Sequence, residues 1–431
     1  MSNSNSNPHC IAFDLGSSNS VCAVYRQGNV EFVPDDTGSF TVPSIVSFTD
    51  TEILVGETAK SQLYINPTNT IYLAKKFMGK NFSAIPSETI KEFPYKILDD
   101  GKDNVIFEVE YKKEKKRYYP EEISALILNK MKNMAMEFLG IDKINNGVVV
   151  TIPAYYSESG KQAVERAIKI SGMDTLRLLA EPSSAALAYG QNNKSSNEKN
   201  IIVIDCGDST HDVSLLNTFE NIYEVLSITG TNNLAGSNIT NKIVEYIKGE
   251  FKKKHKIDIN NPKSLAKITR AAENAKKTLT SSSQAVIDIE NLENIDFQCN
   301  LSRAKFESLC DPIFRELVSY IQPCIADGNL KKSDINDVVL AGGSTRIPKI
   351  QQMVSEIFNG KKLNKTIDPD LAIAQGACIQ SALILGIDDE NTKDLLLIDT
   401  TSIPLGIKVN GFGMQVLIDK NENIPVSRTQ I

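Results

Sequence analysis

Ile11-Ala-Phe-Asp14-Leu-Gly16-Ser-Ser18 and Ile202-Val-Ile-Asp205-Cys-Gly207-Asp-Ser209 are two copies of one pattern at an offset of 191 residues. Each copy is an apolar run that ends in Asp-x-Gly and continues into hydroxyl side chains and a second apolar run. Continuous apolar runs of this length predict strands that are buried on both faces. The pattern therefore predicts two buried strands, each of which ends in a tight polar turn.

Two further pairs of segments follow in the same order. Val148–Pro153 and Val339–Ser344 are each a buried strand that leads into a turn and a helix, again at an offset of 191 residues. The segments that begin at Pro182 and Pro369 each place proline at a helix start and small residues on one helical face. Three matching pairs in one order predict an internal duplication, and we expect two homologous α/β lobes. Within the first lobe, residues 120–140 predict a helix that begins at proline and ends at glycine.

Residues 388–431 differ in kind from the two lobes. A polar stretch precedes the apolar run Leu395–Ile398, and apolar and polar residues then alternate over 403–418 around the turn signal Asn410-Gly411. This pattern predicts a hairpin at the start of an antiparallel β domain. A lone hairpin is only marginally stable in water, so we expect either that the natural protein continues or that the segment packs on another surface.

The composition is that of a folded globular protein and argues against several classes of partner. The chain has 41% hydrophobic and 23% charged residues and a formal net charge of −6, so it has no overall attraction for nucleic acid or anionic membranes. It has no run of about 18 uncharged apolar residues, and its polar N-terminus lacks the apolar core of a secretory signal. The seven cysteines form no C-x-x-C pair, so we expect reduced core thiols and no zinc site. We therefore expect a cytoplasmic or nuclear protein with no nucleic-acid and no membrane partner.

The two Asp-x-Gly turns have the chemistry of a phosphate clamp. Successive backbone N–H groups in such turns bind anions, and Gly16 and Gly207 allow close approach because they lack a Cβ atom. Two such turns on opposite sides of a cleft would hold a polyphosphate, and Asp14 and Asp205 would orient Mg²⁺ through water. A single Asp-x-Gly is usually an ordinary turn, but its duplication favours the phosphate interpretation. The chain has no G-x-x-x-x-G-K-[ST] motif, which excludes a P-loop site.

Two weaker signals each have two interpretations. The glycine-rich turn Gly342–Arg346 enters a helix, where it could hold a phosphate or stack on a base, or could be a packing turn. Glu273, Lys276, Lys277 and Thr280 share one helical face, which on its own is most simply a solvated amphipathic surface. Neither signal by itself predicts a ligand.

These segments together resemble the nucleotide-binding domain of the seventy-kilodalton heat-shock chaperone family of DnaK type. The resemblance extends from about Cys10 to Ile431, and its matching stretches are Ile11–Ser18, Leu73–Gly79, Val149–Tyr155, Glu181–Gly190, Gly342–Pro348 and Asp394–Asp399. It implies an actin-like α/β ATPase fold, with duplicated lobes around a nucleotide cleft. It also implies a division into a disordered tail (1–9), lobe I (10–194), lobe II (195–387), an interdomain linker (388–402) and the first strands of an incomplete peptide-binding β-sandwich (403–431).

The resemblance implies a role for each matching site residue. The residues expected to position the attacking water and support hydrolysis are Lys75, Glu181, Asp205, Thr210 and Asp212. Asp14 and Asp205 are expected to orient hydrated Mg²⁺, with K⁺ as a second candidate ion. The residues expected to hold ATP or ADP are Asp14, Gly16, Ser17, Ser18, Gly207, Asp208, Ser209, Gly230, Glu273, Lys276, Lys277, Thr280, Gly342, Gly343, Ser344, Arg346 and Asp370.

The chain departs from the family pattern in the second phosphate loop. The family usually has Asp-x-Gly-Gly-Gly-Thr-x-Asp, whereas Asp208 and Ser209 here replace two glycines. A carboxylate about 5 Å from a phosphate costs roughly 3 kcal/mol per charge pair at an effective dielectric near 20, which would weaken ATP binding about a hundredfold. We expect this cost unless Asp208 points away from the phosphates or helps to hold the metal. Elsewhere, Lys277 stands in place of a stacking arginine, and Asn19 in place of a tyrosine.

The resemblance leads to two main hypotheses for function. The first is an ATP-dependent chaperone that hydrolyses Mg-ATP slowly to drive binding and release of client peptides. Its expected partners are a J-domain co-chaperone that contacts Arg177, a nucleotide-exchange factor and, only if the natural chain has a complete peptide-binding domain, unfolded clients. The second is a weakly hydrolysing or non-hydrolysing, ribosome-associated type of relative that works with a J-domain protein. A small-molecule kinase of the same superfamily is a third hypothesis, which the linker and β segment disfavour.

Overall fold

Two sheets of matching topology form the framework of the chain, which a computed structural model describes over residues 8–193, 195–393, 395–409 and 413–430. In the first sheet the strand order is β12-β11-β1-β2-β3, and β4 also pairs with β2. Its strands are β1 (Cys10–Asp14), β2 (Asn19–Arg26), β3 (Asn29–Phe32), β4 (Thr41–Pro43), β11 (Val148–Ile152) and β12 (Thr175–Ala180). Strand β1 is fully buried, and runs parallel to β11 and antiparallel to β2.

The second sheet has the order β18-β13-β14-β15-β19-β22, in which β18-β13-β14-β15 repeats the core β11-β1-β2-β3 of the first sheet. Its strands are β13 (Ser195–Cys206), β14 (His211–Glu220), β15 (Ile222–Thr231), β18 (Ile335–Ala341), β19 (Leu396–Thr400) and β22 (Asn423–Ile424). Strand β13 runs parallel to β18 and antiparallel to β14, as β1 does with its two neighbours. The predicted duplication and the predicted two-lobed α/β fold are therefore confirmed. The two Asp-x-Gly turns occupy equivalent places, between the first two strands of each sheet.

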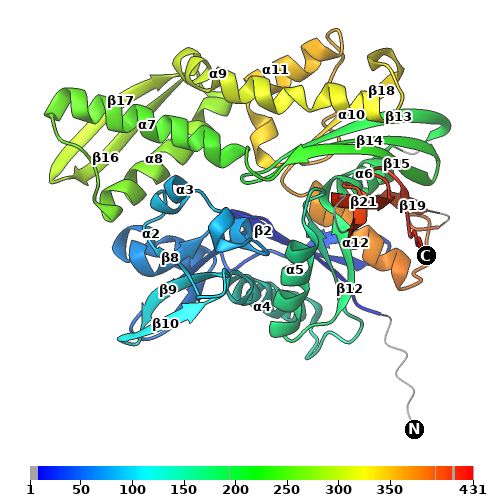
Figure 1. The fold of residues 1–431 in the computed structure, drawn as a ribbon, viewed down its shortest axis with the longest axis horizontal. Coiled ribbons are helices and arrows are strands. Elements are labelled where there is room, and N and C mark those ends of the chain that lie inside the picture. Colours follow the sequence, from blue (N-terminus) through cyan, green and yellow to red (C-terminus); the bar gives the residue numbers. More distant parts are fainter. Residues whose placement is uncertain (1–7, 194, 394, 410–412, 431) are drawn as a thin grey trace.

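Helices and smaller sheets surround the two frameworks, and Figure 1 shows the first half of the chain (blue to teal) below the second half (green to yellow). The helices of the described residues are α1 (Glu57–Lys60), α2 (Gln62–Ile65), α3 (Ser87–Lys91), α4 (Pro120–Leu139), α5 (Glu158–Ile170), α6 (Glu181–Asn192), α7 (Gly236–His255), α8 (Pro262–Ser281), α9 (Arg303–Ser319), α10 (Ile321–Asp327), α11 (Pro348–Ile357) and α12 (Ala372–Ile384). The 3₁₀ helices are η1 (Pro67–Asn69), η2 (Ala74–Phe77), η3 (Phe82–Ala84), η4 (Lys332–Asp334) and η5 (Gly343–Arg346). The small sheets comprise β5 (Ile45–Phe48), β6 (Ile53–Val55) and β7 (Thr70–Tyr72); β8 (Lys96–Asp99), β9 (Val105–Tyr111) and β10 (Glu114–Tyr118); and β16 (Gln284–Leu292) with β17 (Ile295–Ser302).

Each lobe contributes one helix to the core of the other. Helix α6 follows a strand of the first sheet, yet Ala185 on α6 packs with Val203 of the second sheet. Helix α12 follows the second sheet in the chain, yet its Ala374 packs with Ala12 of the first sheet. Figure 1 shows the same exchange, with α12 (orange) lying beside β2 and α6 beside β15. Part of the stretch 195–387 therefore packs with the first sheet.

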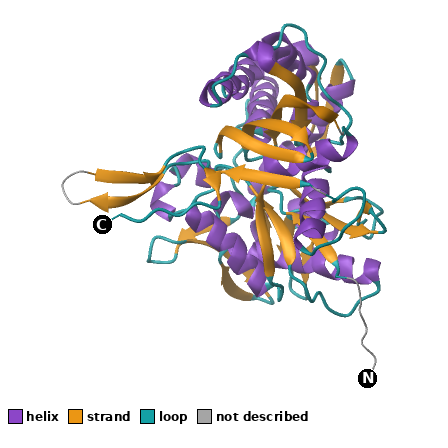
Figure 2. Cartoon of the chain, turned by 90° about the vertical axis from the view of Figure 1, so that its right-hand side faces the viewer, coloured by secondary structure: helices purple, strands orange, loops and turns teal. Residues whose placement is uncertain are grey.

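The segment after α12 forms strands, as its alternating pattern predicts. Strand β19 adds to the edge of the second sheet, parallel to β15. Strands β20 (Leu405–Val409) and β21 (Gly413–Ile418) form an antiparallel hairpin that projects from the body of the molecule, as Figure 2 shows. The predicted turn at Asn410-Gly411 lies outside the described residues, as do residues 1–7 of the predicted tail. Strand β22 then returns to pair with β19.

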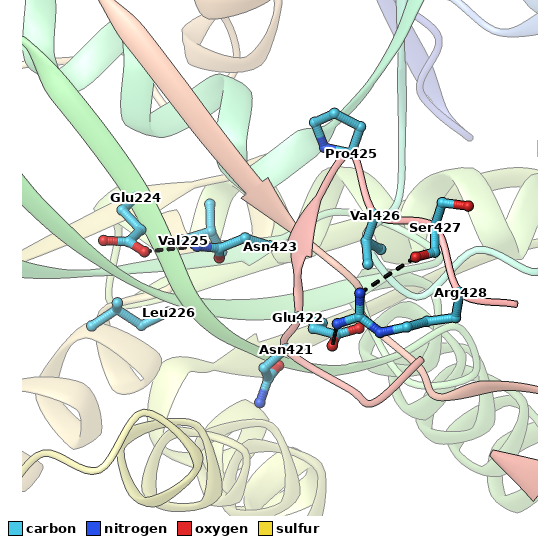
Figure 3. A pocket seen from close by; sticks show the side chains of 10 residues that line it. All are labelled: Glu224, Val225, Leu226, Asn421, Glu422, Asn423, Pro425, Val426, Ser427 and Arg428. Atoms are coloured by element: carbon cyan, nitrogen blue, oxygen red, sulfur yellow. Dashed lines mark hydrogen bonds and ion pairs between the residues drawn. The ribbon is translucent and has the colours of Figure 1, made fainter. Parts of the chain in front are cut away.

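Residues 421–428 border a hollow of about 630 Å³ beside β15. Figure 3 shows the groups that hold this border in place. Asn423 donates a hydrogen bond to Glu224 at 2.9 Å, and Arg428 forms an ion pair with Glu422 at 2.5 Å. The sequence predicts no site residue in this hollow.

Two expectations from composition concern the helices and the thiols. Among the residues that the structure describes, none of the helices combines the length and apolar character needed to cross a bilayer. Six of the seven cysteines are buried and Cys299 is half-buried, as predicted for core thiols.

Candidate functional site

The two Asp-x-Gly turns face one another, and each is held by hydrogen bonds from elsewhere in its own lobe. In the first turn, the Ser44 hydroxyl donates to the carbonyl of Gly16 at 2.8 Å, and the Ser44 N–H donates to the carbonyl of Ser18 at 2.8 Å. In the second turn, the carbonyl of Gly207 accepts bonds from the Gly236 N–H at 3.1 Å and the Ser344 hydroxyl at 2.7 Å. Both loops are therefore fixed in position by their own lobes.

A cleft of about 460 Å³ lies between the loops and contains most of the predicted site residues. Of the predicted residues, those that line it are Asp14, Gly16, Ser17, Ser18, Lys75, Glu181, Asp205, Gly207, Asp208, Thr210, Glu273, Lys276, Lys277, Thr280, Gly342, Gly343, Ser344, Arg346 and Asp370. They come from segments distributed along almost the whole chain. The fold thus brings together groups that the sequence could associate only by pattern and resemblance.

Ser209, Asp212 and Gly230 lie beside the cleft rather than on its surface. Ser209 and Asp212 are buried. Gly230 on β15 pairs with Asp212 on β14, and a Cβ atom at Gly230 would lie 2.4 Å from the Asp212 carboxylate. Gly230 is therefore placed to make room for that carboxylate rather than to contact a ligand.

A buried ion pair closes the inner end of the cleft. Lys75 Nζ lies 2.7 Å from Glu181 Oε1, and both side chains are less than a tenth exposed. Lys75 lies on η2, which begins after Leu73, a residue in the left-handed conformation with φ of 56°. Glu181 is the first residue of α6. A charge-assisted bond between two groups removed from water fixes both side chains in the direction of the cleft.

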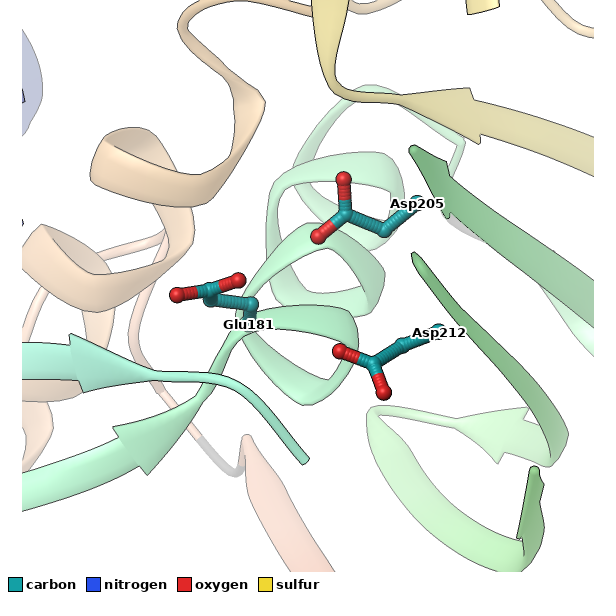
Figure 4. A group of neighbouring side chains, drawn as sticks. All are labelled: Glu181, Asp205 and Asp212. Atoms are coloured by element: carbon teal, nitrogen blue, oxygen red, sulfur yellow. The ribbon is translucent and has the colours of Figure 1, made fainter. Parts of the chain in front are cut away.

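Three more carboxylates surround this ion pair. Glu181, Asp205 and Asp212 present oxygen atoms within 4.8 Å of one another, and in Figure 4 the two aspartates reach from β13 and β14 toward the start of α6. On the opposite loop, Asp14 accepts a hydrogen bond from the Thr151 hydroxyl at 2.8 Å. The resemblance predicts Glu181, Asp205 and Asp212 among the residues that support hydrolysis, and the structure places their carboxylates close together.

Burial and repulsion from neighbouring negative charges raise the pKa values of Asp14, Asp205 and Asp212. Burial, and then the negative charge of Glu181, raise the pKa of Asp14 to about 7, although Lys75 opposes the shift. The same two causes raise the pKa of Asp212 to about 8. Burial and the charges of Glu181, Asp212 and Asp14 raise the pKa of Asp205 well above its ordinary value. One lysine does not balance four buried acids, so the cluster favours a bound cation or bound protons.

Two acceptor atoms support a cation at this place. Oδ1 of Asp205 and Oδ1 of Asp212 are both buried and have no hydrogen-bond partner. Buried acceptors without a partner are costly, and oxygen atoms are the ligands that Mg²⁺ and K⁺ prefer. The residues present therefore fit a hydrated divalent cation between the two phosphate loops.

The glycine-rich turn and the charged helical face both line the same cleft. Arg346 on η5 forms ion pairs with Asp368 at 2.6 Å and with Asp370 at 2.7 Å, which hold its planar guanidinium in place. On α8, Lys276 is only 7% exposed and forms an ion pair with Glu273 at 2.7 Å. The interpretation of this face as a wholly solvated surface is therefore wrong for Lys276, whereas Lys277 is exposed.

Asp208 turns toward the opposite loop. Its Oδ2 atom accepts a hydrogen bond of 2.7 Å from the Ser18 hydroxyl, and the residue lines the cleft. Burial raises the pKa of Asp208, while the charge of Lys276 and the Ser18 hydroxyl oppose this shift. The side chain therefore does not point away from the predicted phosphate position. It also lies outside the group of Glu181, Asp205 and Asp212 that could hold a metal.

Several residues that line the cleft or orient its groups were not predicted from the sequence. Those on the cleft surface are Val21, Ser39, Thr41, Pro43, Glu57, Lys60, Ile347 and Ile373. Most of them lie on or beside β4 and α1, which carry no motif and reach the cleft only through long-range packing. Thr151 could have been found, because it belongs to the duplicated strand Val148–Pro153 that pairs beside Asp14.

Comparison with known proteins identifies the family. The family model described as Hsp70 protein matches residues 10–431. The chain belongs to the Hsp70 family. This finding confirms the predicted resemblance, and it argues against the small-molecule kinase hypothesis.

Curated Hsp70 relatives align with nearly the whole chain. The heat shock 70 kDa protein of Neurospora crassa is 43% identical over 98% of this chain and 65% of its own length. Heat shock cognate 70 kDa protein 3 of Dictyostelium discoideum is 40% identical over 97% of this chain and 67% of its own length. A ribosome-associated molecular chaperone of Saccharomyces cerevisiae is 39% identical over 96% of this chain and 68% of its own length. The chain thus spans about 65% of the length of its Neurospora relative.

Proposed function

We propose that this Hsp70 chain binds Mg-ATP in the cleft and hydrolyses it slowly, as the ATPase part of an ATP-dependent chaperone. One observation carries the proposal. Both Asp-x-Gly turns, the buried Lys75–Glu181 pair and the Arg346 turn line a single cleft, although they come from widely separated segments. Phosphate-binding turns and a fixed planar guanidinium in one cleft suit a polyphosphate joined to an aromatic base.

The chain's own groups supply the chemistry of hydrolysis in this proposal. Mg²⁺, when bound near Asp14 and Asp205, supplies neutralisation of the phosphate charge. Lys75 and Glu181 hold the attacking water in place, and Thr210 supports them from the second loop. Asp212, whose buried Oδ1 atom has no hydrogen-bond partner, supports these groups from beside the cleft.

A second candidate function is ATP binding with little or no hydrolysis, as in a co-chaperone that acts with a J-domain protein. The Asp208 side chain favours this candidate, because it brings a negative charge to the second loop and occupies the Ser18 hydroxyl. The relative from Saccharomyces cerevisiae is named as a ribosome-associated molecular chaperone. The two candidates share the nucleotide site and differ only in turnover.

The partners of the whole protein belong to the same proposal. A J-domain co-chaperone that contacts the surface at Arg177 and a nucleotide-exchange factor are the partners that the family membership supports. Client peptides enter the proposal only if the natural chain contains a complete peptide-binding domain. A cytoplasmic location is part of the same proposal and rests on the family membership.

Single-turnover hydrolysis of ATP separates the two candidates. For a working ATPase, Lys75→Ala should lower the rate at least about a hundredfold, because it removes the group that fixes Glu181 and the water. Binding of ATP to the variant is measured first, since loss of the buried ion pair also destabilises the fold. Lys130→Ala on α4, which removes an exposed ion pair with Asp36, is the matched control and should keep the wild-type rate.

Turnover that Lys75→Ala does not reduce would contradict the assigned site. ATP binding without measurable turnover in the wild type would favour the second candidate.

A further inference from the structure

We propose that Ser18 and Asp208 form a latch between the two lobes, which has to open before the Ser18 hydroxyl can hold a phosphate. Ser18 lies on the loop after β1, and Asp208 lies on the loop after β13. Their hydrogen bond of 2.7 Å therefore joins the two lobes within the cleft that both residues line. The competition with phosphate rests on the proposed function, whereas the latch itself rests on the geometry alone.

Both ends of this hydrogen bond are held by their own lobes. The carbonyl of Ser18 accepts the Ser44 N–H, and the carbonyl of Asp208 accepts the Ser237 N–H at the start of α7, each at 2.8 Å. The Asp208 Oδ1 atom lies close to Gly236, because a Cβ atom added to this glycine would be 3.2 Å from it. Because the backbone on each side is already fixed, the bond forms at little further cost in conformational entropy.

The hydrogen bond competes with a ligand because a serine hydroxyl has one hydrogen to donate. While Ser18 donates to Asp208, it does not donate to a phosphate oxygen. A bond from a hydroxyl to a carboxylate is also stronger than one between neutral groups. A phosphate ligand therefore has to break the Ser18–Asp208 hydrogen bond before Ser18 can donate to it. The free energy needed to break this bond lowers the affinity for the ligand, in addition to any charge repulsion from Asp208.

Two further contacts, outside the cleft lining, join the same lobes and open with the latch. The Arg270 guanidinium on α8 lies 4.8 Å from the centre of the Tyr64 ring on α2. The Asn241 side chain on α7 donates to Glu92, which follows α3, at 3.2 Å. Separation of the lobes breaks these contacts and the Ser18–Asp208 bond together.

Amide hydrogen exchange of the full chain without nucleotide tests the latch independently of ligand binding. Ser18→Ala and Asp208→Ala should each speed exchange in α2 and α8 at least about threefold, and the double variant should be no faster than either single one. Asp208→Asn keeps an acceptor and should retain most of the protection. Exchange in the β16–β17 hairpin, which is far from the latch, should not change. Unchanged exchange in α2 and α8 in both single variants would overturn the latch.

Affinity for Mg-ADP, measured in the same variants, tests the competition. Asp208→Ala should bind Mg-ADP about tenfold more tightly. Ser18→Ala should weaken binding about tenfold in the Asp208→Ala background but less than about threefold in the wild type, where the hydroxyl is already engaged. Ser17→Ala is the neighbouring control and should change the affinity for Mg-ADP by the same factor in the wild type and in the Asp208→Ala background.

Equal effects of Ser18→Ala in both backgrounds would show that Asp208 acts by repulsion alone and would overturn the competition. If no variant binds Mg-ADP, the proposed function fails, and hydrogen exchange still decides whether the latch exists.

Discussion

Four buried carboxylates and one buried lysine determine the chemistry of the cleft at the residue scale. Asp14, Glu181, Asp205 and Asp212 are all less than a tenth exposed, and Lys75 forms its ion pair with Glu181. Burial and repulsion between neighbouring negative charges raise the pKa values of the three aspartates, so these retain protons to unusually high pH. Such a cluster is unfavourable in a protein core unless a cation completes it.

This imbalance predicts how stability depends on pH. The pKa values of Asp14 and Asp212 rise from 3.8 to about 7 and about 8 on folding. Between about pH 4 and pH 8 the folded chain therefore binds more protons than the unfolded chain. Raising the pH through this window should lower the free energy of unfolding by up to about 1.4 kcal/mol per pH unit for each group. Mg²⁺ should stabilise the chain more at pH 8 than at pH 5.5, because it replaces the lost protons.

Urea denaturation at pH 5.5 and pH 8, with and without Mg²⁺, measures both effects. Asp212→Asn is the control, because it removes one of the titrating groups. The free energy of unfolding of this variant should therefore depend less steeply on pH than that of the wild type. Equal pH slopes for the wild type and Asp212→Asn would count against the assigned pKa shift.

The sequence predicts some of these residues more directly than others. The duplication alone identifies Asp14 and Asp205, because each ends the same strand of its lobe. Lys75 and Glu181 follow only from the resemblance, since neither lies in a repeated motif. The direction of the Asp208 side chain was not predictable, because its hydrogen-bond partner lies 190 residues away in the other lobe.

Helices and strands are predicted well wherever their pattern is local. The predicted helix over 120–140 is α4, and Gly140 follows it in the left-handed conformation with φ of 65°. The packing of α6 and α12 was not predictable in the same way. Both helices are rich in small residues and buried around most of their surface, so no polar face indicates which sheet each one covers.

Helices α6 and α12 cross so closely that we expect position 376 on α12 to require glycine. A Cβ atom at Gly376 would lie 1.7 Å from the carbonyl oxygen of Ser184, so the two helices would have to move apart. Gly376→Ala should lower the free energy of unfolding by at least about 2 kcal/mol. Gly249→Ala in α7 is the matched control, because nothing lies within 4 Å of its Cβ position. It should raise stability by up to about 1 kcal/mol.

Urea denaturation of the two variants provides the comparison. Similar changes in stability for Gly376→Ala and Gly249→Ala would show that the helices do not cross as closely as described.

At the scale of the whole molecule, the segment after α12 contacts both lobes. The Tyr25 hydroxyl on β2 donates to the Asp389 carboxylate at 2.8 Å, which attaches the start of the segment to the first lobe. Farther on, Leu396 in β19 pairs with Ile222 in β15, on the second lobe. A relative movement of the lobes would therefore change the geometry of this segment. This arrangement connects the two lobes with the projecting β20–β21 hairpin.

Calorimetric titration of the purified chain with Mg-ATP tests the central claim, that the cleft between the lobes is a nucleotide site, most directly. The account predicts one site for each chain, a weaker signal without Mg²⁺, and tighter binding by Asp208→Ala. The absence of binding at millimolar Mg-ATP in both the wild type and Asp208→Ala would contradict it.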